Sequence, residues 1–279
     1  MRRTMLRVAL LSCAALAVSP ALAVHSWGKY HWGRTSNPLN LRVVDAVTSQ
    51  WDGALNTAIS DWQIPNFLQL TEEPDSPYNA KKCTAITGKV LVCNAAYGQR
   101  GWLGIATIWA SGDHITKATT KLNDSYHSYP PYNTSAWRAL VMCQEIGHDF
   151  GLGHQDENHS NANLNTCMDY TNSPESNQHP NEHDYDMLKS IYAHTDSVNT
   201  SATQTTDFGL RILGQAPVAP PGLNEEAGDS PAEWGRAIGT DGHGRPNLYV
   251  MDLGGGRKKI THVFWAIGEG PNGKHRDAH

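Results

Sequence analysis

The residues best suited to metal binding and catalysis lie between positions 144 and 154. Gln144 and His148 are four residues apart, so on a helix both side chains lie on one face and can point at one metal ion. Gly151 can adopt a positive φ and end this helix, and the turning chain can bring His154 back to the same point. Three protein ligands and one open position are typical of a catalytic zinc. The spacing therefore predicts one Zn²⁺ per chain, held by Gln144, His148 and His154.

Glu145 directly follows the first predicted ligand and is the residue predicted to transfer protons. It points about 100° around the helix from Gln144, so it lies beside the metal, within reach of a metal-bound water. Zinc lowers the pKa of such a water to about 7. The carboxylate of Glu145 can accept the proton and pass it to the leaving amine. The predicted reaction is peptide-bond hydrolysis by the zinc-bound water, with Glu145 as the general base.

The same residues resemble a known family. The pattern E-x-x-H-x-x-G-x-x-H, which occupies residues 145–154, resembles the metzincin clan of zinc endopeptidases. The resemblance covers roughly residues 38–195 and is similar to compact members such as matrixins and snapalysin-like enzymes. It implies an α+β fold with a twisted mixed sheet, a backing helix, an active-site helix and a following C-terminal helix. It also implies endoproteolysis of protein or peptide substrates.

Further roles come from the resemblance. It implies that Met168 lies in a tight turn beneath the metal, and that Tyr170 binds the metal or the transition-state oxyanion. One predicted strand resembles the clan's edge strand, which binds extended substrate by β-augmentation. The substrate-binding residues implied by this strand are Leu103, Gly104, Ile105 and Ala106.

One position departs from the clan's pattern, because the first ligand of the clan is histidine and this chain has Gln144. The amide oxygen reaches about as far as the imidazole Nε2, and both ligands are neutral. An oxygen donor is harder than imidazole and binds zinc less tightly. The alternative is therefore a catalytically degenerate, secreted metal-binding or protein-binding module on a peptidase fold. The presence of Glu145, Met168 and Tyr170 favours an active peptidase.

The cysteines indicate disulfide bonds. Four of them follow residue 23, and an even number in an exported chain suggests two disulfides, for which three pairings are possible. We favour Cys83–Cys93, which would close a short hairpin. We also favour Cys143–Cys167, because these cysteines flank the first ligand and the turn methionine that the resemblance brings together.

The surrounding sequence supplies elements that can position these residues. Apolar residues recur at intervals of three and four over residues 48–62, which predicts an amphipathic helix. A second helix is predicted from about 136 to 151, and a third from 180 to 194. The predicted strands cover residues 39–44, 89–93, 102–109 and 114–122, and a long polar loop covers 155–178.

The N-terminal residues 1–23 have the features of a secretory signal peptide. Three arginines precede an apolar run that ends at the Ala21-Leu22-Ala23 cleavage motif, which predicts a secreted, extracellular or periplasmic protein. We expect a metallopeptidase domain over 24–198 and a linker over 199–232. The C-terminal tail over 233–279 contains a predicted β-hairpin around a triple-glycine turn.

Composition and spacing also limit the partners. The formal net charge is −5 and no basic patch is present, so we expect no nucleic-acid partner. No stretch after residue 23 predicts a membrane span, and we expect a monomer. Asp156, Glu157 and Asp169 are possible calcium ligands, but their spacing is not that of an EF-hand. His179 and His183 are interpreted as surface histidines, because no third ligand is placed near them.

Overall fold

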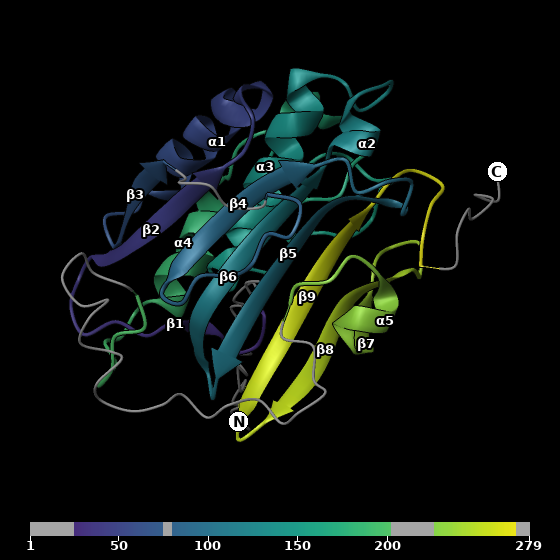
Figure 1. The fold of residues 1–279 in the computed structure, drawn as a ribbon. Helices are drawn as coiled ribbons and strands as arrows, with labels where there is room; N and C mark the ends of the chain where they lie inside the picture. Colours follow the sequence, from purple (N-terminus) through teal and green to yellow (C-terminus); the bar gives the residue numbers. More distant parts are fainter. Residues whose placement is uncertain (1–24, 75–79, 202–225, 272–279) are drawn as a thin grey trace, which may run out of the picture.

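The computed structural model describes residues 25–74, 80–201 and 226–271, so the predicted signal peptide lies outside the described part of the chain. The described residues have the expected α+β class, and the longer helices lie on one face of a mixed nine-stranded sheet (Figure 1). No helix within the described residues has both the length and the apolar character needed to cross a bilayer.

The first part of the sheet forms around helix α1 (Ser49–Trp62). Strand β2 (Leu39–Ala46) precedes this helix and pairs in parallel with strand β3 (Leu68–Pro74), which follows it. The apolar stripe of α1 is buried in the core, as its periodicity predicts, and consists of Trp51, Leu55, Ala58, Ile59 and Trp62.

Strands β4 (Lys89–Ala95), β5 (Trp102–Ser111) and β6 (His114–Asn123) form the middle of the sheet. Strand β4 is parallel to both β2 and β6, whereas β5 is antiparallel to β6. A short strand, β1 (His31–Trp32), also pairs in parallel with the start of β6.

Helix α3 (Ser135–Asp149) carries the motif and packs against α1 and β5. Its N-cap is Thr134, whose hydroxyl accepts a hydrogen bond from the Trp137 N–H at 3.2 Å. A short helix, α2 (Asp124–His127), and a 3₁₀ turn, η1 (Pro174–Ser176), lie on either side of it in sequence.

Helix α4 (Glu182–Ile191) begins slightly later than the sequence predicts. Asn181 is its N-cap, and its side chain accepts from the His183 and Asp184 N–H groups. The Asp184 carboxylate in turn accepts from the Asn181 N–H at 2.8 Å, which completes a capping box. Pro180 therefore lies before the helix rather than within its first turn.

The C-terminal region continues the sheet. After helix α5 (Pro231–Trp234) come strands β7 (Arg236–Thr240), β8 (Pro246–Gly254) and β9 (Arg257–Trp265). Strands β8 and β9 form the predicted hairpin, and β9 pairs antiparallel with β5. The strand order is β3-β2-β4-β6-β5-β9-β8-β7, and the yellow strand β9 of Figure 1 lies beside β5. The domain boundaries at 198 and 232 stay predictions.

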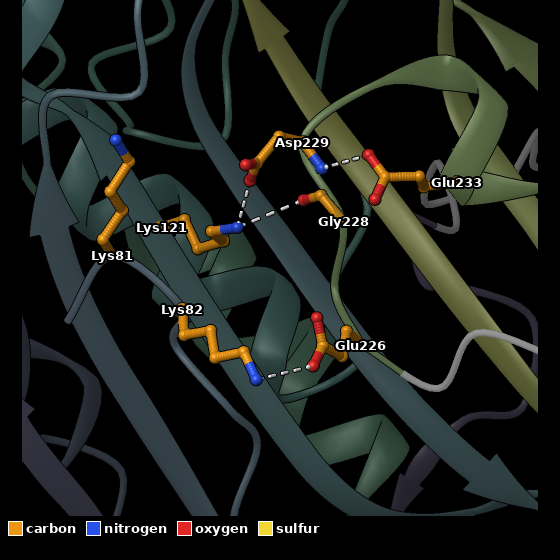
Figure 2. A pocket seen from close by; sticks show the side chains of 7 residues that line it. All are labelled: Lys81, Lys82, Lys121, Glu226, Gly228, Asp229 and Glu233. Atoms are coloured by element: carbon orange, nitrogen blue, oxygen red, sulfur yellow. Dashed lines mark hydrogen bonds and ion pairs between the residues drawn. The ribbon is translucent and has the colours of Figure 1, made fainter. Parts of the chain in front are cut away.

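A buried lysine attaches the start of this C-terminal region to the rest of the sheet. Figure 2 shows Lys121 of β6 in an ion pair with Asp229, while its Nζ also donates to the Gly228 carbonyl at 3.2 Å. Burial lowers the pKa of Lys121, although Asp229 opposes this effect. An exposed pair, Lys82 and Glu226, lies 3.5 Å apart in the same pocket. The region is thus held by contacts outside the hairpin itself.

Two disulfides join the cysteines in the two pairings favoured above. Cys83 and Cys93 have a Cα separation of 6.0 Å, and Cys143 and Cys167 have one of 5.9 Å. Both values lie within the usual disulfide range of about 4.4–6.8 Å. The second disulfide connects α3 to the loop that follows the motif.

Candidate metal centre

Three side chains of the motif converge at the C-terminal end of α3. His148 Nε2 lies 3.1 Å from His154 Nε2, and the amide nitrogen of Gln144 lies 2.7 Å from the same His154 atom. Gly151, with a φ of 96°, lets the chain turn back after the helix. A Cβ at this glycine would lie 2.2 Å from the Tyr30 carbonyl oxygen, so only glycine fits there.

The hydrogen bonds of both histidines orient their Nε2 atoms toward one point. His148 Nδ1 donates to the Leu152 carbonyl at 2.8 Å, and His154 Nδ1 donates to the Glu157 carboxylate at 2.8 Å. Burial lowers the pKa of His148 well below its ordinary value and also lowers that of His154. Each neutral ring therefore presents an Nε2 lone pair to the other. A cation between the two Nε2 atoms would bind both lone pairs. The hydrogen bonds of the two Nδ1 atoms are those typical of metal-binding histidines.

Gln144 is completely buried beside this pair, and its Oε1 has no hydrogen-bond partner. The oxygen and nitrogen of a side-chain amide are assigned from the hydrogen-bond network and can be exchanged by rotating the amide. In the rotated position the oxygen faces His154 Nε2. The side chain thus points at the two histidines, and its role as a ligand stays a prediction.

Glu145 lies where β5 closely approaches α3. Its carboxylate is fully buried, and a Cβ on Gly104 would lie 2.9 Å from Glu145 Cγ. Burial raises the pKa of Glu145 well above its ordinary value, although a hydrogen bond from the Ala106 N–H opposes this effect. A buried carboxyl group next to the histidine pair is positioned for proton transfer at this point.

Met168 packs under the motif helix. A Cβ on Gly147 would lie 2.7 Å from Met168 Sδ, so the methionine contacts α3 next to His148. The Met168 carbonyl accepts from the Gln155 N–H at 2.6 Å, which closes the loop between the motif and the methionine. This position is compatible with the turn that the family resemblance implies.

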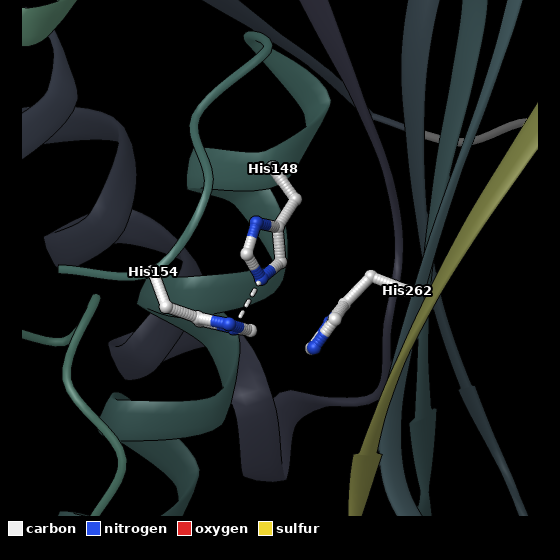
Figure 3. A group of neighbouring side chains, drawn as sticks. All are labelled: His148, His154 and His262. Atoms are coloured by element: carbon white, nitrogen blue, oxygen red, sulfur yellow. Dashed lines mark hydrogen bonds between the residues drawn. The ribbon is translucent and has the colours of Figure 1, made fainter. Parts of the chain in front are cut away.

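His262 of β9 is a member of the site that the sequence analysis missed. Donor atoms of His148, His154 and His262 all lie within 4.8 Å of one another, as Figure 3 illustrates. His262 Nδ1 is 3.1 Å from Glu145 Oε2, and its Nε2 is 2.9 Å from the Tyr170 hydroxyl. Burial lowers the pKa of His262 to about 3, so the ring is neutral. The only sequence signal was a histidine inside an apolar strand.

Tyr170 is close to the motif but is held by residues of the C-terminal region. Its ring centroid lies 4.4 Å from that of His154. Its hydroxyl contacts His262 and also accepts from the Asn247 amide at 3.2 Å. The position is compatible with a role at the metal, and its present partners come from β8 and β9.

The strand expected to bind substrate is an interior strand in this structure. Gly104 pairs with Phe264, and Ala106 pairs with His262. The edge position predicted for β5 is therefore not found, because the tail folds back and β9 takes the backbone hydrogen bonds of this edge. The sequence contained no local signal for this pairing. All four expected substrate-binding residues are buried, namely Leu103, Gly104, Ile105 and Ala106.

The three suggested calcium ligands bind other groups. The Asp156 carboxylate accepts from the Asn158 N–H at 2.7 Å, and Glu157 contacts His154. The Asp169 carboxylate accepts from the Leu164 N–H at 2.8 Å. These contacts organise the loop after the motif, and the calcium prediction gains no support from them.

No family model and no curated protein matches the sequence. Among solved structures, the chain is similar to High choriolytic enzyme 1, a hatching enzyme zinc-protease from the medaka fish Oryzias latipes. The TM-score is 0.33 at 10% sequence identity, and the match covers 58% of this chain and 94% of that chain. A structural similarity of this size does not indicate a shared function.

Proposed function

We propose that this protein is a secreted zinc-dependent endopeptidase whose active site is closed by its own C-terminal hairpin. The observation that carries the proposal is the pair of Nε2 atoms of His148 and His154, 3.1 Å apart, with both Nδ1 atoms bound elsewhere. A buried carboxylate, Glu145, lies next to this pair. This combination fits a catalytic zinc site better than a structural cluster of histidines.

Each residue has a separate task in the proposed reaction. Gln144, His148 and His154 would hold the zinc, which supplies Lewis-acid activation of a water molecule and of a peptide carbonyl. Glu145 would take a proton from the attacking water and deliver it to the leaving amine. The hydroxyl of Tyr170 would donate to the developing oxyanion once it is released from His262.

The hairpin must move before a peptide can bind. Strand β9 occupies the edge of β5 along which an extended substrate would pair, and His262 occupies the space beside Glu145. A substrate in extended conformation can form the same backbone hydrogen bonds to β5 only after β9 has separated from β5. The described conformation is therefore the latent form in this proposal.

A second candidate is a metal-binding module without catalysis. His262 brings a third imidazole to the site, and together with Gln144 this makes four possible protein ligands. A metal with four protein ligands has no open position for water, which is typical of structural zinc. In this alternative the hairpin never leaves the site.

One experiment separates the two candidates. Cleavage of casein is measured with purified mature wild type, His262→Ala, and the double variant His262→Ala with Glu145→Gln. The endopeptidase proposal expects His262→Ala to cleave at least about tenfold faster than wild type, because the hairpin loses its contacts to Glu145 and Tyr170. The double variant should be inactive.

A matched control is Lys258→Ala, which changes an exposed residue of the same strand and should leave the rate unchanged. Zinc is counted in every sample. Zinc-loaded protein that cleaves nothing, with or without His262, would establish the metal-binding module. Activity that persists in the double variant would refute the role of Glu145.

A further inference from the structure

A second group of histidines lies away from the motif, where three distant segments meet. His31 belongs to β1, His114 begins β6, and His194 and Asp196 follow α4. His31 Nε2, His114 Nε2 and His194 Nε2 lie 3.3, 3.2 and 3.4 Å from the same oxygen, Asp196 Oδ1. The Nε2 atoms of His31 and His194 are 3.3 Å apart.

We propose that His31, His194 and Asp196 form a second transition-metal site, most suited to Zn²⁺, with His114 as the positioning partner of the carboxylate. Donor atoms of the three proposed ligands all lie within 4.8 Å of one another. Zinc–ligand bonds of about 2.0–2.2 Å at tetrahedral angles place neighbouring ligand atoms about 3.3–3.5 Å apart. The distances of 3.3, 3.4 and 3.3 Å among these three ligands agree with this requirement.

The orientation of His31 supports a cation at this point. Its Nδ1 donates to the Lys29 carbonyl at 2.7 Å, which orients its Nε2 toward Asp196 and His194. A lone pair facing a carboxylate oxygen is repelled unless a proton or a metal ion lies between them. Asp196 is also fixed, because its Oδ2 accepts from the Arg34 N–H at 2.9 Å. The pair of imidazoles favours zinc over calcium or magnesium, which prefer oxygen ligands.

The proposed site would join the two ends of the domain that carries the motif. The Asp196 N–H donates to the Arg34 carbonyl at 2.7 Å, and the Thr200 N–H donates to the Gly33 carbonyl at 3.0 Å. Upstream of His31, Trp27 stacks on His148 with ring centroids 4.7 Å apart. The role of the second metal is therefore structural, since it fixes the N-terminal segment that covers one side of the motif.

The test counts metal in the full mature chain. Protein is saturated with Zn²⁺, freed of excess metal by gel filtration and measured by inductively coupled plasma mass spectrometry. We expect two zinc ions in wild type and one in both His194→Ala and Asp196→Asn. His194 is more than half exposed, so its replacement should not prevent folding. His179→Ala, which changes another exposed histidine, is the matched control and should keep two.

A variant of the motif keeps this inference separate from the proposed peptidase. His148→Ala with His154→Ala should retain one zinc ion, and adding His194→Ala should remove it. If the motif binds no zinc, wild type holds one ion and His194→Ala holds none, so the second site still stands. Equal zinc content in wild type, His194→Ala and Asp196→Asn would overturn the proposal and identify the cluster as hydrogen-bonded histidines around one carboxylate.

Thermal unfolding gives a readout that does not depend on activity. A metal that binds only the folded state raises the melting temperature. We expect added Zn²⁺ to raise the melting temperature of the His148→Ala, His154→Ala double variant. The same addition should have no effect once His194→Ala is included, and a shift of equal size in both proteins would contradict the proposed ligands.

Discussion

At the scale of single residues, the site depends on how closely β5 approaches the helix below it. Gly104 lies opposite Val141 and Glu145, and a Cβ added there would meet Val141 Cγ1 at 2.6 Å and Glu145 Cγ at 2.9 Å. Neither neighbour can retreat easily, because both are fully buried. The glycine therefore sets the position of the proposed base relative to the strand.

Replacing Gly104 tests this close approach. We expect Gly104→Ala to destabilise the fold by about 1–3 kcal/mol, since extra volume in a packed core displaces its neighbours. Gly53→Ala is the matched control, because its Cβ would meet nothing within 4 Å on an exposed face of α1. The control should stabilise by about 0.5–1 kcal/mol. Urea unfolding measures both, and a neutral Gly104→Ala would show that the strand can shift.

A buried histidine outside the candidate metal sites makes stability depend on pH. Burial lowers the pKa of His127 to about 4 from 6.5, although its hydrogen bond to the Tyr132 carbonyl opposes this. Above pH 6.5 the residue is neutral in both states. As the pH falls from 6.5 to 4, the unfolded chain binds a proton that the folded protein does not, so stability is lost.

The loss attributable to His127 is on the order of 3 kcal/mol, from about 1.4 kcal/mol per pKa unit. We expect His127→Phe to unfold with a weaker pH dependence than wild type between pH 6.5 and 4, whatever its stability at pH 7. Urea unfolding at several pH values gives the two slopes. Equal slopes for the two proteins would mean that His127 binds a proton as readily in the folded protein as in the unfolded chain.

At the scale of elements, the C-terminal region contacts the rest of the protein both through β9 and through the segment before α5. Strand β9 pairs with β5, and the segment before α5 is anchored by the buried pair of Lys121 and Asp229. Lys259 Nζ also donates to the Glu226 and Glu233 carbonyls at 2.6 and 2.9 Å, which ties β9 to that segment. Loosening the anchor should therefore loosen the hairpin.

We expect Asp229→Asn to destabilise the C-terminal region by about 1–3 kcal/mol, because it leaves the charge of Lys121 buried without its counter-ion. The backbone amides of β9 should then exchange hydrogen faster than those of β4. Lys82→Met, which removes an exposed pair, should cost less than about 1 kcal/mol and leave the exchange unchanged. Unchanged protection of β9 in Asp229→Asn would show that strand pairing alone holds the hairpin.

At the scale of the whole molecule, a segment remote in sequence covers the proposed active site. If the latent form depends on strand pairing and on His262, the strand should also inhibit when supplied separately. We expect a peptide of residues 257–265 to inhibit casein cleavage by the His262→Ala protein. A peptide with alanine in place of His262 should inhibit at least about tenfold less well, a difference of about 1.4 kcal/mol. Equal inhibition by both peptides would remove His262 from the mechanism of latency.

The sequence by itself determined the local features. The periodicity of α1, the position of the motif on a helix ending before Gly151, the hairpin around residues 254–256 and the Cys83–Cys93 disulfide all depend on neighbouring residues or on short loops. Hydrophobic spacing and turn residues act within one element, so they can be interpreted without knowing the partners of that element.

Only the tertiary structure decided which elements share an edge or a site. His262 reaches Glu145 because β9 pairs with β5 in one particular register, and a shift of one residue would turn its side chain to the opposite face. His31, His194 and Asp196 meet because the segment after α4 forms backbone hydrogen bonds to Gly33 and Arg34, directly after β1. Contacts between distant segments depend on the order of strands and on burial of the whole core, and neither is encoded in the local spacing of residues.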